Sequence, residues 1–348
     1  ARCEITRLPR VSWALNVRPG FSWKKVLYDI LLFRKTTDIL GRRQFDLIHA
    51  VEESAFLAAY FSRRLAIPFV YDMDSSIPGQ LGEKWAVLRL LGPLFRIAEK
   101  KAVQASIGVL PVCRAVEDIA RGHAPGVLCQ RLEDVSLLPP PGQGDIPDHA
   151  RLDEEVGSVV CMYVGNLERY QGIDLLLEAF ARAAGRDGRL RLVIIGGSDG
   201  DIAAYRQKTA AMDLAGKVRF TGRRPVADLH YYLAQADILV SPRSRGVNTP
   251  MKIYSYLDSG TAVLATAIRA HTQVLDHNIS WLAEPAPEAM AEGLLRLSAD
   301  GGLRRKLGAR ARERVRQEHS LEAFQRKLHD FYSRVEKEIS RNREVRKR

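Results

Sequence analysis

Short apolar runs alternate with helical patterns in the first part of the chain, between about Ile5 and Leu138. The apolar runs of strand length are Phe45–Ala50, Ile67–Tyr71 and Ser106–Val112. The stretches between them repeat their apolar residues at helical spacing. Strands that alternate with helices are typical of a parallel sheet, because each connection must cross a face of the sheet. The pattern therefore predicts a doubly wound α/β domain.

The same alternation resumes after a segment of turn formers and charges, which runs from Pro139 to about Gly157 and predicts an interdomain linker. The strands expected after it are Val159–Val164, Leu190–Ile195, Val218–Thr221, Ile238–Ser241, Ala262–Thr266 and Ile279–Leu282. The helices expected between them are Asp174–Ala184, Ile202–Leu214, Val226–Ala234 and Lys252–Leu257. This series predicts a second doubly wound α/β domain.

The end of the chain, from Leu303 to about Ile339, has a helical pattern and leads into a basic tail. A length of 348 residues exceeds what one hydrophobic core usually supports, so two domains are expected. We predict a Rossmann-like domain in residues 1–145, a second in residues 146–318, and a C-terminal helix and tail in residues 319–348.

Charge and cysteine content narrow the function classes. The formal net charge of +12 favours anionic partners such as phosphorylated molecules or an acidic membrane surface. The basic residues are not interleaved with aromatic residues on one element, which argues against nucleic acid. The four cysteines are scattered without zinc or disulfide spacing, so we expect reduced structural thiols in a cytoplasmic protein. No apolar run approaches the roughly 18 residues that span a bilayer.

Glycine and positive charge gather in the loops that follow the expected strands of the second domain. These loops are Gly165–Gly172, Gly196–Gly200, Gly222–Arg224 and Pro242–Pro250. The carboxyl ends of parallel strands meet at one edge of a sheet, where backbone N–H groups and cations suit a diphosphate. The alternative is that the glycines only make turns and the arginines form a solvated rim. The GxGxxG and GxxxxGK[ST] motifs are absent from the sequence, which argues against a dinucleotide oxidoreductase and a P-loop ATPase.

Five ordered blocks in residues 158–318 resemble the donor-binding half of retaining glycosyltransferases of family 4. The blocks are Val164–Asp174, Leu192–Gly197, Val218–Gly222, Ala236–Pro242 and Lys252–Gly260. The resemblance implies the GT-B fold and retaining transfer of a sugar from a nucleotide diphosphate donor to a glycan or lipid-linked acceptor, in the synthesis of cell-envelope polysaccharide or glycolipid. It implies no cofactor and no obligatory metal.

The resemblance, together with the loop positions, assigns a set of donor-binding residues. They are Gly165, Asn166, Arg169, Gln171, Gly197, Arg243, Asn248, Thr249, Pro250, Lys252 and Ser255. The family usually has cations at the positions of Asn166 and Gln171, and two glutamates at the positions of Val247 and Ser255. We expect Lys252 and the N–H groups of the preceding turn, with Arg243 or Arg245, to replace the lost cations. The alternative for Lys252 is that it only begins a helix.

The first domain matches the family more loosely. Asp74 follows an expected strand, near the position where the family commonly has a His that contacts the donor sugar. His49 lies at the end of the strand before it, so we expect Asp74 and His49 to be catalytic. Capping or core roles for both residues remain open. Family members begin with a strand, a Gly-rich loop, a helix and a second strand that have no counterpart before Ala1, so we expect about 40 further residues upstream.

Two basic amphipathic stretches, Phe21–Leu40 and Lys84–Lys101, combine Trp and Leu with Lys or Arg. Such helices suit an anionic bilayer surface, although core packing also explains an apolar stripe. They predict a cytoplasmic protein that lies peripherally at the inner face of the membrane. Two other functions remain open: a GT-B protein that binds nucleotide or lipid without transferring sugar, and a nucleotide-sugar epimerase.

Overall fold

The computed structural model describes residues 4–9, 23–76, 92–139, 145–152 and 155–347, and the chain divides into two compact units. Unit 1 contains Ala1–Leu132 and His329–Arg348, and unit 2 contains Glu133–Leu328. None of the helices in the described ranges is long and apolar enough to cross a membrane.

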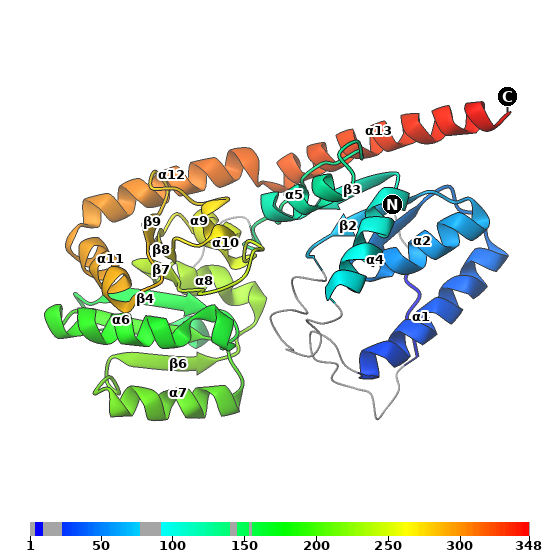
Figure 1. Cartoon of the computed structure of the whole chain (residues 1–348). Helices are drawn as coiled ribbons and strands as arrows, with labels where there is room; N and C mark the ends of the chain where they lie inside the picture. Colours follow the sequence, from blue (N-terminus) through cyan, green and yellow to red (C-terminus); the bar gives the residue numbers. More distant parts are fainter. Residues whose placement is uncertain (1–3, 10–22, 77–91, 140–144, 153–154, 348) are drawn as a thin grey trace. The chain divides into compact units, whose positions relative to one another are not determined.

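Unit 1 has a parallel sheet in the order β1-β2-β3, as the alternating pattern predicts (Figure 1). Its strands are β1 (Ile48–Val51), β2 (Phe69–Met73) and β3 (Gly108–Pro111). The helices in its described residues before the C-terminal one are α1 (Trp23–Arg42), α2 (Ser54–Leu65), α4 (Gly92–Ala105) and α5 (Arg114–His123). The strands begin two or three residues later than the apolar runs predict. The central strand β2 contributes Phe69, Tyr71 and Met73 to the small core of this unit, and all four residues of β3 are buried beside it.

Unit 2 has a six-stranded parallel sheet in the order β6-β5-β4-β7-β8-β9 (Figure 1). The strands are β4 (Val159–Val164), β5 (Leu190–Ile195), β6 (Val218–Gly222), β7 (Ile238–Ser241), β8 (Ala262–Thr266) and β9 (Trp281–Ala283). Alternate residues of β4 belong to different cores: Cys161 faces one and Met162 the other. A strand that is buried on both faces must be apolar throughout, which is why continuous apolar runs predict this sheet well.

Helices cover both faces of this sheet. The core on one face includes residues of α6 (Ile173–Arg186), α7 (Asp199–Ala211) and α11 (Pro287–Ala299). The core on the other face includes residues of α8 (Leu229–Leu233), α9 (Lys252–Ser259) and α12 (Gly301–Glu318). Two helices on the first face also contact each other, since α6 and α11 pack side by side. The second domain is therefore doubly wound, as predicted.

The C-terminal region is helical, as the pattern predicts, and the helix continues beyond Ile339 into the basic tail. The region forms α12 and then α13 (Leu321–Lys347), and α13 continues into unit 1. Phe331 of α13 is fully buried in unit 1, and a Cβ atom added at Gly108 would lie 2.8 Å from its ring. The expected third segment, residues 319–348, is thus split between the two units. Apolar periodicity identifies a helix but does not show which domain its apolar face packs against.

The boundary between the units also lies earlier than predicted, at Leu132 and Glu133 instead of residue 145. The described part of the expected linker packs on unit 2: Ala150 and Leu152 are buried in its core, and the backbone N–H of Leu152 donates to Gln235 at 2.9 Å. The cysteines Cys113, Cys129 and Cys161 are buried free thiols, and Cys3 lies outside the described residues. These thiols agree with the structural role that the sequence predicts.

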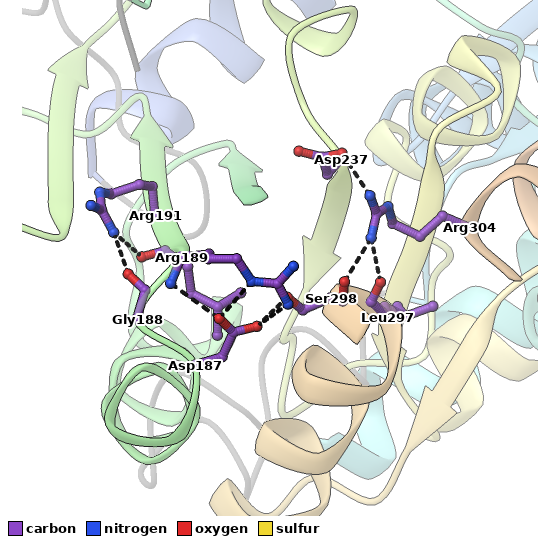
Figure 2. A network of polar contacts seen from close by, with 9 residues as sticks. Asp187, Gly188, Arg189, Arg191, Asp237, Leu297, Ser298 and Arg304 are labelled. Atoms are coloured by element: carbon purple, nitrogen blue, oxygen red, sulfur yellow. Dashed lines mark hydrogen bonds and ion pairs between the residues drawn. The ribbon is translucent and has the colours of Figure 1, made fainter. Parts of the chain in front are cut away.

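A polar network joins the amino edge of the unit 2 sheet to α11 and α12 (Figure 2). Arg304 donates to the carbonyl oxygens of Leu297 and Ser298 in the last turn of α11, at 2.7 and 3.0 Å. It also pairs with Asp237 at 3.1 Å. Asp187 accepts hydrogen bonds from Arg189 and Ser298, and these donors hold the pKa of its carboxyl well below the usual range.

We expect Arg304→Met to lower the free energy of unfolding by about 2 kcal/mol, because two helix-end carbonyls and the Asp237 carboxylate lose their charged donor. Arg305→Met is the matched control, since Arg305 is the exposed neighbour on the same helix. Urea unfolding measures both variants. Equal stability of the two variants would contradict the role of Arg304.

Candidate donor-binding site

The order of the strands in unit 2 places the candidate site. From β4 the chain runs outward through β5 and β6, then returns to β7 beside β4 and runs the other way through β8 and β9. In open parallel sheets the ligand crevice lies at the carboxyl ends of the two strands where this reversal occurs. Those ends lead directly into Gly165–Gly172 and Pro242–Pro250. Two of the four loops predicted from sequence therefore meet at the expected position.

Glycine is required where these loops come together. Gly172 has a φ of +75°, and a Cβ atom there would lie 1.9 Å from the carbonyl oxygen of Pro242. The backbone N–H of Ser244 donates to the carbonyl of Tyr170 at 3.0 Å. Any side chain at position 172 would separate the two loops. Gly172 therefore keeps the loop after β4 against the loop after β7.

Lys252 is the cation at the centre of this group. It begins α9, and its Nζ lies 3.2 Å from the Oε1 of Gln171 and 3.9 Å from the centre of the Tyr163 ring. Gly165 is close as well, because a Cβ atom there would lie 3.1 Å from the same Nζ. Burial, with a smaller effect of Arg243, lowers the pKa of Lys252 well below its usual value. An anion beside this ammonium would offset both effects.

The turn before α9 presents a buried hydroxyl. Thr249 is 8% exposed, and its Oγ1 has no hydrogen-bond partner among the residues that the structure describes. Asn248 and Pro250 flank it, and the carbonyl of Pro250 accepts from the N–H of Ile253 at 2.9 Å, which begins the helix. A buried hydroxyl without a partner costs free energy. The beginning of α9 thus combines a positive helix end, Lys252 and an unsatisfied polar group.

Arg243 organises its own loop. Its guanidinium donates to the carbonyl oxygens of Arg245 at 2.7 Å and Asn248 at 3.1 Å, and it lies 5.2 Å from the centre of the Tyr170 ring. The sequence predicts Arg243 as a donor-binding cation. In the structure its contacts show a bracing role in the loop, and the exposed Arg245 is the side chain that points to solvent.

Four other predicted donor residues are placed differently from one another. Asn166 and Arg169 are exposed in the loop after β4. Gly197 is buried, and a Cβ atom there would lie 2.6 Å from Leu167, so it serves packing. Ser255 is 1% exposed and accepts the backbone N–H of Leu137 at 3.1 Å. It ties the segment that enters unit 2 to α9, which differs from the ligand contact predicted for it.

The two residues predicted to be catalytic belong to unit 1. Asp74 is exposed directly after the carboxyl end of β2. His49 lies within β1, not after it, and both of its ring nitrogens have partners: Nε2 lies 3.1 Å from Asp72, and Nδ1 contacts the hydroxyl of Tyr332. These contacts join β1 to β2 and α13, although the His49 side chain is 36% exposed, so the catalytic role of His49 stays a prediction. The catalytic role of Asp74 stays a prediction.

The sequence did not single out two other parts of this region. The Tyr163 ring lies under Lys252 at the end of an apolar strand, where the sequence predicts only core. His271 of α10 (Arg269–Thr272) is fully buried beside the carboxyl ends of β7 and β8. A lone His between small residues carries no signal of such a place. Within the described ranges, no group of three or more His, Cys, Asp or Glu could hold a metal ion.

Residues 158–300 match the family model described as "Glycosyl transferases group 1". The chain is also similar to phosphatidyl-myo-inositol mannosyltransferase of Mycolicibacterium smegmatis, with 30% identity over 150 residues, which are 42% of this chain and 38% of that protein. The residues matched by the family model include the loops after β4 and β7 described above. The chain spans about a third to a half of the length of the curated relatives it matches.

The fold as a whole is similar to solved structures. Sucrose-phosphate synthase from Thermosynechococcus elongatus superposes with a TM-score of 0.73 at 20% identity, covering 91% of this chain and 80% of that one. HepE of Anabaena has a TM-score of 0.72 at 16% identity and covers 89% of each chain. Both are GT-B proteins. The chain has the GT-B fold. Its two units correspond to the two α/β domains of that fold, as the sequence predicts.

Proposed function

We propose that this protein is a retaining glycosyltransferase of family 4 that takes a sugar from a nucleotide diphosphate donor, and that unit 2 binds the donor. The observation that carries the proposal is the cluster at the carboxyl ends of β4 and β7. There Lys252, Gln171 and the Thr249 hydroxyl, which has no partner among the described residues, lie near the start of a helix. The match of residues 158–300 to the group 1 glycosyl transferases supports it. HepE, which shares the fold, is described in complex with UDP and with UDP-glucose.

In this proposal the cluster stabilises the leaving diphosphate. Transfer leaves negative charge on the nucleotide, and preorganised donors placed where that charge develops lower the barrier. Lys252 supplies a cation in a partly buried position, the Thr249 hydroxyl supplies a donor, and the start of α9 supplies backbone N–H groups. We propose that these groups act without an obligatory metal. Asp74, exposed at the end of β2, is proposed to contact the sugar or the acceptor.

Direct assay of sugar transfer tests the proposal. UDP-, GDP-, ADP- and TDP-sugars are offered with membrane lipids or oligosaccharides as acceptors, and the labelled product is analysed together with its anomeric configuration. Formation of a product with the configuration of the donor supports retaining transfer. Nucleotide binding without any product would favour the binding protein instead, a function that the neutral Asn166 and Gln171 also fit. Interconversion of the donor without acceptor would favour an epimerase.

Thr249→Val gives a sharper test of the cluster. The substitution removes a buried hydroxyl that has no hydrogen-bond partner among the residues that the structure describes. We therefore expect unchanged or slightly higher thermal stability of the ligand-free protein. We expect nucleotide affinity to fall about ten-fold, because one hydrogen bond to a charged oxygen is lost. Titration calorimetry and thermal unfolding measure the two effects. Unchanged affinity would remove Thr249 from the site.

We also propose that the acceptor is lipid-linked, in the synthesis of a cell-envelope glycolipid or polysaccharide, and that unit 1 contacts an anionic membrane at its cytoplasmic face. On α4, Leu94 and Ile97 are 63% and 52% exposed, and Lys100 and Lys101 are exposed on the same helix. On α1, by contrast, the Phe33 ring stacks on Phe61 at 5.3 Å, so part of that apolar stripe is core. Trp85 and Leu88 of the second predicted stretch lie outside the described residues.

Reversing the charge of α4 tests the membrane proposal. We expect Lys100→Glu with Lys101→Glu to weaken binding to vesicles of anionic lipid roughly ten-fold or more, since each basic residue near such a surface contributes about 1 kcal/mol. Arg305→Glu with Lys306→Glu, which reverses two adjacent exposed basic residues of α12 in unit 2, is the control. Co-sedimentation measures binding. Equal retention of both variants would contradict a role for α4.

A further inference from the structure

A fully buried histidine lies beneath the loop that follows β7. The ring of His271 is flanked by Ser241, the last residue of β7, and Thr266, the last residue of β8. Its Nε2 lies 2.9 Å from the Ser241 hydroxyl. Its Nδ1 lies 2.8 Å from the carbonyl oxygen of Thr266 and 3.0 Å from the Thr266 hydroxyl. The ring thus contacts the carboxyl ends of two adjacent strands.

These distances determine which atoms donate. The Thr266 carbonyl only accepts, so Nδ1 carries the hydrogen. The Thr266 hydroxyl donates to the carbonyl oxygen of Arg243 at 2.5 Å and therefore accepts from the same Nδ1–H. Nε2 of the neutral ring then accepts from the Ser241 hydroxyl. The hydrogen bonds run in one direction, from Ser241 through His271 and Thr266 to the backbone of Arg243.

This chain of hydrogen bonds ends on Arg243, the residue whose side chain braces the Pro242–Pro250 loop. Arg243 holds the carbonyls of Arg245 and Asn248, and Asn248 directly precedes Thr249. On the far side, Gln273 donates to the carbonyl of Val247 at 2.8 Å, from just after the helix that carries His271. The loop is therefore anchored at both ends to the segment around α10.

We propose that His271 is a positioning residue that holds the Pro242–Pro250 loop in the shape that binds the donor diphosphate. It acts through Ser241 and Thr266 and does not touch the donor. The identity of the ligand rests on the proposed function. The anchoring of the loop rests only on the hydrogen bonds described above. The neutral ring suits this role, because a proton on Nε2 would turn an acceptor into a second donor facing a hydroxyl.

Two variants and one control test this role in the intact 348-residue chain. His271→Asn keeps a polar side chain that is too short to reach both strands. Thr266→Val keeps the shape of the side chain and removes only the hydroxyl that donates to Arg243. Ser298→Ala is the control, since Ser298 is also a buried hydroxyl of unit 2 but bonds Asp187 in the amino-edge network of Figure 2.

Hydrogen exchange of the loop amides, measured by mass spectrometry, reads the anchoring without any ligand. We expect exchange in residues 242–250 to rise about ten-fold in both variants, the effect of one lost buried hydrogen bond, and to stay at the wild-type rate in Ser298→Ala. We expect the KM for the donor to rise by a similar factor with a smaller change in kcat. Unchanged exchange and KM in both variants, at whatever thermal stability, would overturn the proposal. If exchange in residues 242–250 is faster in both variants but the wild type binds no nucleotide, the anchoring of the loop by His271 is supported and the proposed function is contradicted.

Discussion

Lys252→Ala is expected to abolish most of the stabilisation that a nucleotide gives to this protein. In the proposed site, the variant loses both the cation at the carboxyl ends of β4 and β7 and its charged hydrogen bond to the phosphate. We therefore expect the affinity for the nucleotide to fall about 100-fold. A ligand at 100 times its dissociation constant stabilises the wild type by about 2.7 kcal/mol. At the same concentration the variant would gain only about 0.4 kcal/mol. Thermal unfolding with a panel of nucleotide sugars measures both.

The free variant separates binding from folding. Burial and Arg243 both disfavour the charged form of Lys252, which offsets its contacts with Gln171 and Tyr163. We therefore expect the free variant to unfold within about 1 kcal/mol of the wild type. Lys217→Ala is the matched control: it makes the same change of charge at the amino edge of the sheet, where Lys217 donates to the carbonyl of Ala184. A wild-type thermal shift in Lys252→Ala would remove Lys252 from the site.

Unit 2 shows how much of the fold could be predicted from sequence. Strands β4, β5, β7 and β8 have the same ends as the apolar runs that predict them. Each is buried on both faces, and the first three are followed directly by Gly or Pro. In unit 1 the runs are less sharply bounded, so β1 and β2 begin later than expected. The division into domains could not be predicted to the residue, since it depends on long-range packing such as that of Phe331 on Gly108.

The candidate site was predictable to the level of loops but not of individual contacts. Glycines after strands identified the loops that meet at the carboxyl ends of β4 and β7, and Lys252 was expected to face a ligand there. The sequence could not show that Arg243 donates to carbonyls of its own loop, or that Ser255 bonds the backbone of Leu137. Those contacts depend on where side chains and distant segments lie in three dimensions. His271 had no signal at all, since its partners Ser241 and Thr266 are ordinary strand ends.

The surroundings of His271 make the folded protein sensitive to mild acid. Burial lowers the pKa of His271 from 6.5 to about 4, and the cations Lys252 of α9 and Arg243 of the loop add to this effect, although the hydrogen bond to Thr266 opposes it. Between these two pH values the unfolded chain binds a proton that the folded chain does not. Stability therefore rises with pH across this window. The contribution of His271 is complete above pH 6.5 and is lost as the pH falls towards 4.

We expect this single group to cost unit 2 about 3 kcal/mol of stability between pH 6.5 and 4, at roughly 1.4 kcal/mol for each unit of pKa shift. His271→Asn has no titrating group at this position, so between pH 6.5 and 4 it should lose about 3 kcal/mol less stability than the wild type. At pH 7 we expect the variant to be less stable than the wild type. Carboxylates such as Asp187, whose pKa is lowered, lose their contribution only below this window. Urea unfolding is measured from pH 4 to 8. Hydrogen exchange of the amides in β7 and β8 serves as the probe, so that the unfolding of unit 2 is measured by itself. Parallel pH curves for wild type and variant would show that the buried ring does not titrate in this range.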